Sequence, residues 1–286
     1  MSINTAAAVR VPKQPAGGSL TDTLMEELQQ LPPSRAAALR VVQVVDDSDT
    51  SSADVAEAAS VDPALTARIL RVANSAYYGL SGRVGTPAFA VTVVGFQTVR
   101  SLAALSAAGI AGDDEMPDSF WIRAARTASG ASLVARRIGA PGPEAFCAGL
   151  LHALGSALLH RYDRTRYSVL LDVSTSRRHL LDLERKAYGS THAQLCADVL
   201  VGWQFPADLT SAIRQQDIDP REARDPLLRA LIVGRTMSDH LAGDVELGDP
   251  DFQAALTAGQ LRPIEVQGLL DQVEVAAGQL VQALSV

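Results

Sequence analysis

Apolar side chains recur every three or four positions along most of this chain, which is the spacing of one face of an α-helix. The pattern begins at Leu20 and runs almost to the C-terminus, interrupted only by glycine, proline and short polar stretches. We see no ladder of alternating residues that would indicate strands, so the pattern predicts an all-α fold. Helices are expected at 20–31, 36–45, 54–59, 63–78, 87–94, 97–108, 120–138, 143–160, 166–175, 180–188, 191–203 and 207–215, with two or three more between 225 and 286.

Breaks in this pattern divide the chain into four parts. Residues 1–19 mix alanine, proline, glycine and polar residues without periodicity, which is typical of a disordered tail. A polar stretch at 112–117 separates an N-terminal helical subdomain, 20–118, from a second helical subdomain, 119–218. Residues 219–286 then form a helical C-terminal extension. The sequence therefore predicts two packed helical subdomains followed by an extension.

The stretch from Asp62 to Gly79 carries the most specific local signals. Asp62 is a good N-cap, and Pro63 suits the first helical position, where its missing N–H is not needed. Gly79 is expected to end the helix. One apolar stripe is expected from Leu65, Ile69, Val72 and Ala76. The favoured interpretation is a core helix, and the alternative is a ligand contact from Asn74, Tyr77 or Tyr78.

This stretch, DPALTARILRVANSAYYG, resembles the central signature of the HDOD family, the HD-related output domains of bacterial signalling. Other segments resemble the family in the same order, and together they cover about residues 20–216. They are Leu31-Pro32-Pro33, Ala90 with Val94-Gly95, Phe146 to Gly155, and Glu184, Gly189 and His192, followed by Trp203 and Pro206. The resemblance implies an all-α fold that descends from metal phosphohydrolases and serves in signal transduction.

The same resemblance implies that the metal ligands of those hydrolases have been lost. His152 corresponds to the histidine of the His-Asp dyad, but Ala153 replaces the aspartate, and Arg123 stands where the first histidine is expected. Gln215-Gln216 falls where many relatives carry two histidines. A divalent cation needs several converging carboxylate or imidazole donors, and hydrolysis needs that cation to activate water. We therefore expect no metal, no cofactor and no enzymatic activity.

His152 has two interpretations, whereas Glu184 and His192 have one expected role. His152 is expected to be a core histidine bonded between helices, or otherwise a polar wall of a ligand pocket. Glu184 and His192 are eight residues apart, but Gly189 is expected to break the helix between them. A structural polar contact is the expected role for both.

Charge is distributed unevenly along the chain. The net charge of −7 argues against a protein that coats nucleic acid. Residues 119–190, however, hold 11 basic and 5 acidic side chains, a balance of +6, whereas 1–118 carries −5 and 191–286 carries −8. The central band is therefore the part of the chain expected to meet an anion.

Within that band, Arg123, Arg126 and Arg137 fall within about 60° of one another on one helix, with Gly130 on the same face. A small residue between arginines would let a phosphate-bearing ligand approach the backbone, and guanidinium groups suit phosphate. Arg161, Arg164 and Arg166 follow further along the chain. These three arginines and His152 are further candidates for contacts with the ligand. The favoured interpretation is a solvated helix face with its loops. The alternative is a binding site for a cyclic dinucleotide such as cyclic di-GMP, or for an acidic protein partner.

Two other classes of protein are weighed against this interpretation. The segment Thr86–Ala104 has the outline of a helix-turn-helix, but its second helix contains one basic residue, Arg100, so DNA binding is not expected. A residual metal-dependent phosphohydrolase or phosphodiesterase is the alternative enzyme. No Gly-x-Ser-x-Gly elbow supports a serine hydrolase.

The sequence also bears on where the protein is located and what it binds. No apolar run approaches the roughly 18 residues of a membrane span, and residues 1–18 lack the apolar segment of a secretory signal. Cys147 and Cys196 are expected to be buried free thiols, as in a reducing cytoplasm. The C-terminal stripe must pack on this chain or form a homodimer or partner interface: Ile264, Leu269, Val273, Ala277, Leu280 and Leu284. The sequence thus predicts a cytoplasmic, non-catalytic signalling module that acts on an unidentified protein partner.

Overall fold

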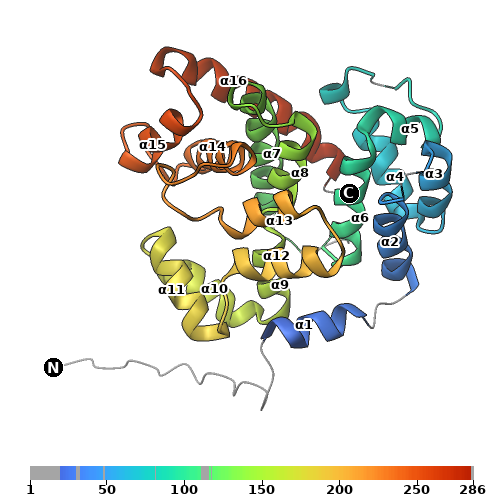
Figure 1. The fold of residues 1–286 in the computed structure, drawn as a ribbon, viewed down its shortest axis with the longest axis horizontal. Helices are drawn as coiled ribbons and strands as arrows, with labels where there is room; N and C mark the ends of the chain where they lie inside the picture. The colour runs from blue at the N-terminus through green and yellow to red at the C-terminus, as the bar shows by residue number, and fades with distance from the viewer. Residues whose placement is uncertain are drawn as a thin grey trace.

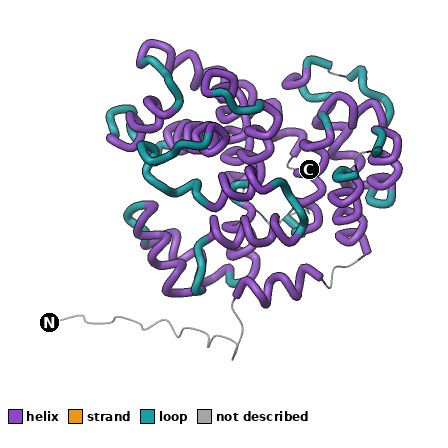
Figure 2. Tube along the Cα trace, in the orientation of Figure 1, coloured by secondary structure: helices purple, strands orange, loops and turns teal. Residues whose placement is uncertain are grey.

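The computed structural model describes residues 20–29, 33–47, 49–80, 82–110, 116 and 118–284. This part of the chain contains only helices, turns and loops (Figure 2), which confirms the all-α prediction. The predicted disordered tail, residues 1–19, lies outside the described residues, as do Leu31-Pro32 and most of the polar stretch at 112–117.

Helices α2 to α6 form one side of the molecule, in blue and teal in Figure 1, whereas α1 packs against α12 (His192–Gly202) of the middle of the chain. Helix α2 packs against α3 and α6, and α3 and α4 both pack against α5. Local sequence explains several boundaries, because Ser51 and Asp54 form a capping box at α3, and Thr86 with Pro87 opens α5. The elements are α1 (Leu20–Gln29), α2 (Pro33–Val44), α3 (Ser52–Ser60), α4 (Pro63–Ala73), the 3₁₀ helix η1 (Ala76–Tyr78), α5 (Pro87–Val94) and α6 (Phe96–Ala107).

The middle of the chain is organised around α7 (Asp118–Ile138), which packs against α8 and α14. Helices α9 and α13 both pack against α12, and α8 joins this group to α6 of the N-terminal side. These helices are α8 (Gly142–Leu151), α9 (Leu154–Tyr162), α10 (Arg164–Val173), α11 (Arg177–Tyr188), α12 (His192–Gly202) and α13 (Ala207–Arg214).

The C-terminal extension consists of α14 (Pro226–Leu241), α15 (Pro250–Ala258) and α16 (Pro263–Leu284). Helix α16 lies along α7 and reaches α4 and η1, so it joins both sides of the molecule (Figure 1). The predicted apolar stripe therefore packs on its own chain. Its members are buried except Ile264, which is 86% exposed because it lies in the first turn of α16 on the outer side.

One continuous apolar core contains residues from all three predicted segments, 20–118, 119–218 and 219–286. Cys147 and Cys196 lie in this core as free, buried thiols, as predicted. The division into subdomains remains a prediction about folding units, since a shared core does not by itself separate them.

Two predicted helices end earlier than expected. The segment 143–160 is two helices, because α8 ends at Leu151 and α9 begins at Leu154. Helix α4 ends at Ala73, with Asn74 as its C-cap, so Ala76 leaves the predicted stripe and is exposed. Ser75 is extended there, with φ −64° and ψ 152°, which turns the chain away from the helix axis.

Helix α7 meets α14 at a contact between two glycines. A β-carbon on Gly130 would lie 3.0 Å from the Cα of Gly234, and one on Gly234 would lie 2.5 Å from the carbonyl oxygen of Thr127. The backbones therefore approach each other more closely than any larger residue would allow. This contact fixes α14 beside α7 and places charged side chains from both helices next to one another.

None of the helices that the structure describes is both long and apolar enough to cross a membrane alone. Helices α5 and α6 are long and apolar enough only when taken together, and the chain bends by 108° between them at Gly95.

Candidate functional site

The break between α8 and α9 positions His152, which is half-buried. Its Nδ1 lies 2.7 Å from the carbonyl oxygen of Gly149, and its own carbonyl accepts a hydrogen bond from Gln216 Nε2 at 3.1 Å. Burial lowers the pKa of His152 to about 4, although the contact with Gly149 acts in the opposite direction. His152 is therefore a neutral imidazole whose ring bonds within its own turn, while its backbone carbonyl bonds to the segment after α13. Its role as a core histidine or as the wall of a ligand pocket stays a prediction.

A cluster of charged side chains lies beside His152, and Asp217 is at its centre. Asp217 Oδ1 accepts hydrogen bonds from Arg235 Nη1 at 2.8 Å and from Arg177 Nη1 at 3.2 Å. Arg177 Nη2 donates in turn to Asp239 Oδ2 at 2.8 Å. We call the following set the ionic cluster: Arg177, Glu184, His192, Asp217, Arg235 and Asp239.

Glu184 and His192 form the buried end of the ionic cluster. Glu184 is fully buried and accepts hydrogen bonds from the Tyr167 hydroxyl and from the backbone N–H of His192, both at 2.9 Å. His192 Nδ1 also lies 2.9 Å from this carboxylate, and its Nε2 lies 3.5 Å from Asp217 Oδ2. Burial acts to lower the pKa of His192, but Asp217 and Glu184 outweigh it and raise that pKa. Glu184 and His192 therefore contact each other, although the sequence left open whether they share a face.

The positive charges of the ionic cluster come from two arginine side chains, Arg235 and Arg177. Burial lowers the pKa of Arg235 to about 10, which still leaves this guanidinium charged at neutral pH. Burial acts on Arg177 in the same direction, but Asp239 and Asp217 outweigh it and raise the pKa of Arg177. Two guanidinium groups therefore occupy the space between the carboxylates and satisfy their charge.

This donor set does not fit a divalent cation. Among the described residues, no group of three or more His, Cys, Asp or Glu side chains converges as metal ligands. Two oxygens of the site, Gln216 Oε1 and Asp217 Oδ2, accept no hydrogen bond from the described residues. Two available oxygens are fewer than the four or more ligands that a divalent cation usually takes. Arg177 and Arg235 would in addition repel a cation. Ala153 adds no donor at the position expected for an aspartate.

The three predicted arginines of α7 share one face, but that face lies against the C-terminal extension. Arg123 pairs with Asp239 at 3.3 Å and with Asp244 at 2.6 Å. Through Asp239, Arg123 therefore extends the ionic cluster to the start of α7. Gly130, on the same face, receives Gly234 of α14 rather than a ligand.

The other two arginines of this face meet α16. Arg126 forms a two-pronged pair with Glu274, at 2.7 Å for both contacts, and its side chain is only 13% exposed. Arg137 pairs with Glu265 at 3.2 Å. The acidic C-terminal segment thus pairs with all three arginines of this α7 face.

The remaining predicted arginines are not brought to this face. Arg161 donates to the carbonyl oxygen of Ala108 at 2.6 Å, at the end of α6. Arg164 is exposed, and Arg166 lies over the ring of Tyr188 at 5.2 Å. These contacts indicate local structural roles, and ligand binding by these residues stays a prediction.

The polar residues of the signature hold separate parts of the fold together. Asn74 donates to the carbonyl of Val84 at 2.8 Å and accepts from its N–H at 3.0 Å, which anchors the loop before α5. Tyr77 bonds to Ser132 of α7, and Tyr78 bonds to Thr98 of α6. Both tyrosines line a hollow of about 520 Å³ between these helices. The hydroxyls are therefore engaged within the protein.

Helix α6, the second helix of the helix-turn-helix outline, faces inward. Its basic residue, Arg100, is fully buried and pairs with Asp46. Its Nη2 also donates to the carbonyl of Gln204 at 2.7 Å. Arg100 is thus committed to internal contacts and does not face a nucleic-acid groove in this conformation.

Sequence reasoning missed most of the ionic cluster. Glu184 and His192 were expected to make polar contacts, but the sequence predicted no role for Arg177, Asp217, Arg235 or Asp239. One signal was available, because Arg235 interrupts an apolar run in α14, LLRALIVGRTM, where a charged residue must find a buried partner.

Comparisons with known proteins agree with this architecture. The family model described as HDOD domain matches residues 31–218. An uncharacterized protein of Treponema pallidum (strain Nichols) is 24% identical over 202 residues, which make up 68% of this chain and 39% of that protein. The chain thus spans well under half the length of that curated relative.

Two solved structures are similar over most of the chain. A Shewanella amazonensis SB2B protein, provisionally described as a phosphohydrolase, has a TM-score of 0.69 and 24% identity, and the alignment covers 93% of this chain and 98% of that one. A Marinobacter aquaeolei VT8 protein, provisionally described as a signal transduction protein, has a TM-score of 0.72 and 25% identity, with coverage of 97% and 64%. The first likeness shows the fold alone.

Proposed function

This chain belongs to the HDOD family, and from that premise we propose that it is a non-catalytic regulatory module of bacterial signal transduction, located in the cytoplasm. It acts by contact with another protein rather than by turning over a substrate. The similar Marinobacter protein, provisionally described as a signal transduction protein, supports the signalling part of this proposal.

The observation that carries the proposal is the ionic cluster beside His152. Metal-dependent hydrolysis needs free carboxylate and imidazole donors around a cation that activates water. Here Arg177 and Arg235 hold Asp217 and Asp239 in ion pairs, and His192 is bonded to Glu184. A metal would have to displace the buried guanidinium group of Arg235 and the partly exposed one of Arg177 from their carboxylates. Separating a buried ion pair is costly.

Gating by an anionic nucleotide such as cyclic di-GMP is a second part of the proposal. At the arginine face, phosphate groups would compete with Glu274 for Arg126 and with Glu265 for Arg137. Binding there would loosen α16 from α7, and the surface under α16 would become available to a partner. The Arg137–Glu265 pair is the easier of the two to open, because the Arg137 side chain is 42% exposed and exposed ion pairs contribute only about 0–1 kcal/mol. The Arg126–Glu274 pair is better shielded, with Arg126 13% exposed.

The catalytic part of the proposal is tested by hydrolysis assays. Protein purified without chelators is incubated with bis-p-nitrophenyl phosphate and with cyclic di-GMP, in the presence of Mn²⁺, Fe²⁺ or Ni²⁺. We expect no turnover above that of a His152→Ala control. Metal-dependent hydrolysis that His152→Ala abolishes would contradict the proposal and would restore the phosphohydrolase alternative.

The protein-contact part is tested separately. Tagged full-length chain is used to capture partners from extract of its native cell, with and without cyclic di-GMP. We expect a partner that is retained at the same stoichiometry over repeated washes. If the chain captures nothing beyond an unrelated tagged helical protein under either condition, this part of the proposal is wrong.

A further inference from the structure

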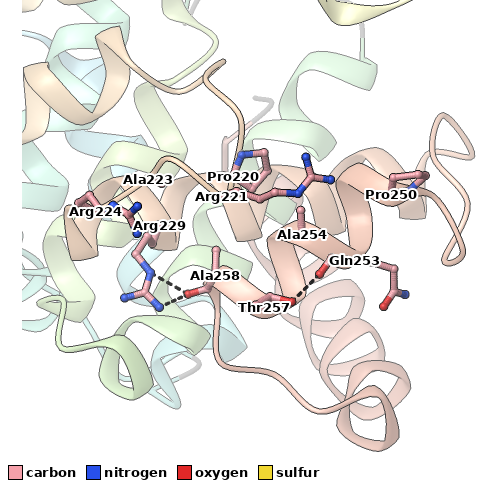
Figure 3. A pocket seen from close by; sticks show the side chains of 10 residues that line it. All are labelled: Pro220, Arg221, Ala223, Arg224, Arg229, Pro250, Gln253, Ala254, Thr257 and Ala258. Atoms are coloured by element: carbon pink, nitrogen blue, oxygen red, sulfur yellow. Dashed lines mark hydrogen bonds between the residues drawn. The ribbon is translucent and has the colours of Figure 1, made fainter.

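A second hollow lies in the C-terminal extension, outside the segment that the family model matches. It is bounded by the loop before α14, by the first turns of α14, and by α15 (Figure 3). Its volume is about 700 Å³. Hollows of roughly 300–1,000 Å³ are the size that small-molecule sites usually have.

Three arginines line this hollow, and no acidic residue lines it: Arg221, Arg224 and Arg229. Arg229 is held in place, because its Nε donates to the carbonyl oxygen of Ala258 at 2.8 Å and its Nη2 donates to the same oxygen (Figure 3). Arg229 therefore forms a fixed, positively charged wall at the C-terminal end of α15.

The other two arginines are less committed. Arg221 pairs with Asp219 at 2.9 Å, but the two side chains are 60% and 35% exposed, so water weakens this pair. Arg224 is exposed, and it forms no ion pair with any residue that the structure describes. Both guanidinium groups thus retain donors for an incoming ligand.

This arrangement differs from the arginine face of α7. There, each of Arg123, Arg126 and Arg137 meets a carboxylate of the C-terminal extension. In the hollow, Arg221 alone pairs with a carboxylate, that of Asp219, and Arg224 and Arg229 pair with none among the described residues. Like charges gathered in one concave surface repel one another, and a bound anion relieves that repulsion.

We propose that this hollow is a binding site for a small phosphate-bearing molecule. Figure 3 shows Arg224 beside Arg229 at one end of the hollow, whereas Arg221 points toward the other end. Arg224 and Arg221 therefore contact phosphate groups at opposite ends of the ligand with paired N–H donors, and Arg229 supplies a third positive charge from the wall.

Gln253 and Thr257 border the same hollow. The Gln253 amide donates to the carbonyl oxygen of Leu247 at 2.7 Å, and the Thr257 hydroxyl donates to that of Gln253 at 3.0 Å. A concave site of this volume favours a small molecule over an extended acidic peptide.

The proposal is tested by titration calorimetry on the full-length chain with pyrophosphate and with ADP, at constant ionic strength and with sulfate as a non-specific anion. We expect saturable binding of at least one probe, with one molecule per chain. The double variant Arg221→Ala, Arg224→Ala should bind that probe about tenfold more weakly or worse, because two charge-assisted contacts are lost.

A matched control removes the same charge elsewhere. Arg83→Ala, Arg178→Ala changes two exposed arginines away from the hollow and should bind as the unmodified chain does. The single variant Arg224→Gln, which has no ion pair to lose, should also weaken binding and guards against loss of folding in the double variant.

Three outcomes would overturn the proposal: no saturable binding of either probe, equal weakening in the control, or tighter binding of a glutamate-rich peptide than of ADP. The last outcome would identify a docking surface for an acidic protein. None of them bears on the proposed lack of hydrolysis, which the assays beside His152 test independently.

Discussion

Replacing Asp217 with asparagine removes the carboxylate at the centre of the ionic cluster while keeping the shape of the side chain. Asp217 is only 8% exposed, and so is its partner Arg235. After the change, Arg235 and Arg177 keep their charges, and the nearest carboxylate, Asp239, contacts Arg177. A buried guanidinium group is then left without the partner that offset its desolvation.

The expected loss of stability follows from that uncompensated charge. Removing one partner of a buried ion pair usually costs about 3–5 kcal/mol. Burial alone would raise the pKa of Asp217, but His192, Arg235 and Arg177 outweigh it and lower that pKa. A carboxyl whose pKa is lowered by folding adds stability above its unfolded pKa of about 3.9, and this stability is lost as the pH falls through the folded value. The whole contribution is therefore present at pH 7.

The control is the same chemical change at the surface. Asp198 pairs with Arg214 at 2.6 Å, but the two side chains are 36% and 42% exposed. Asp198→Asn should cost less than about 1 kcal/mol. Urea unfolding at pH 7, followed by far-UV circular dichroism, measures both variants against the unmodified chain. If Asp217→Asn costs no more than Asp198→Asn, the ionic cluster does not hold this region together.

Two further predictions use other parts of the site. Burial lowers the pKa of His152 from 6.5 to about 4, so the folded protein resists protonating it. The free energy of unfolding should therefore fall by up to about 3 kcal/mol between pH 6.5 and 4, relative to that of the His152→Gln variant. If the urea midpoints of the two proteins change in parallel across this range, His152 contributes nothing to the pH dependence. A β-carbon on Gly155 would lie 1.9 Å from the carbonyl oxygen of His192, so Gly155→Ala should lower the free energy of unfolding by about 1–3 kcal/mol. Gly268→Ala in α16 meets nothing within 4 Å and should raise that free energy by up to about 1 kcal/mol; thermal melts that rank the two variants the other way would refute this reading of the α9–α12 contact.

Local signals in the sequence were enough to place many helix boundaries. Asp62 with Pro63 and Thr86 with Pro87 each open a helix where expected. These features depend only on neighbouring residues, so they can be read without the fold. Gly95, with φ 81° and ψ 156°, ends α5 for the same reason.

The break between α8 and α9 at His152 could not be predicted from neighbouring residues. The segment Leu150 to Gly155 is apolar and suits a continuous helix. Gln216, far along the chain, donates to the His152 carbonyl, and Gly155 packs against the backbone of His192. Contacts between distant segments therefore override the local preference for helix.

The site was only partly predictable for the same reason. The shared face of Arg123, Arg126 and Arg137 follows from helical spacing, but their partners lie more than a hundred residues away. The opposite charges of residues 119–190 and 191–286 were the available clue that these segments neutralise each other. Asp217 gave no signal at all, because a single aspartate in a polar loop looks the same whether it is buried or exposed.

The central claim is that guanidinium groups of the chain stand where a hydrolase of this fold would hold its metal. Anomalous diffraction from crystals soaked in Mn²⁺ tests it most directly. The account predicts no anomalous peak beside His152, with Arg177 and Arg235 still bonded to Asp217. A manganese ion coordinated by His152 and Asp217, with Arg177 moved aside, would contradict it.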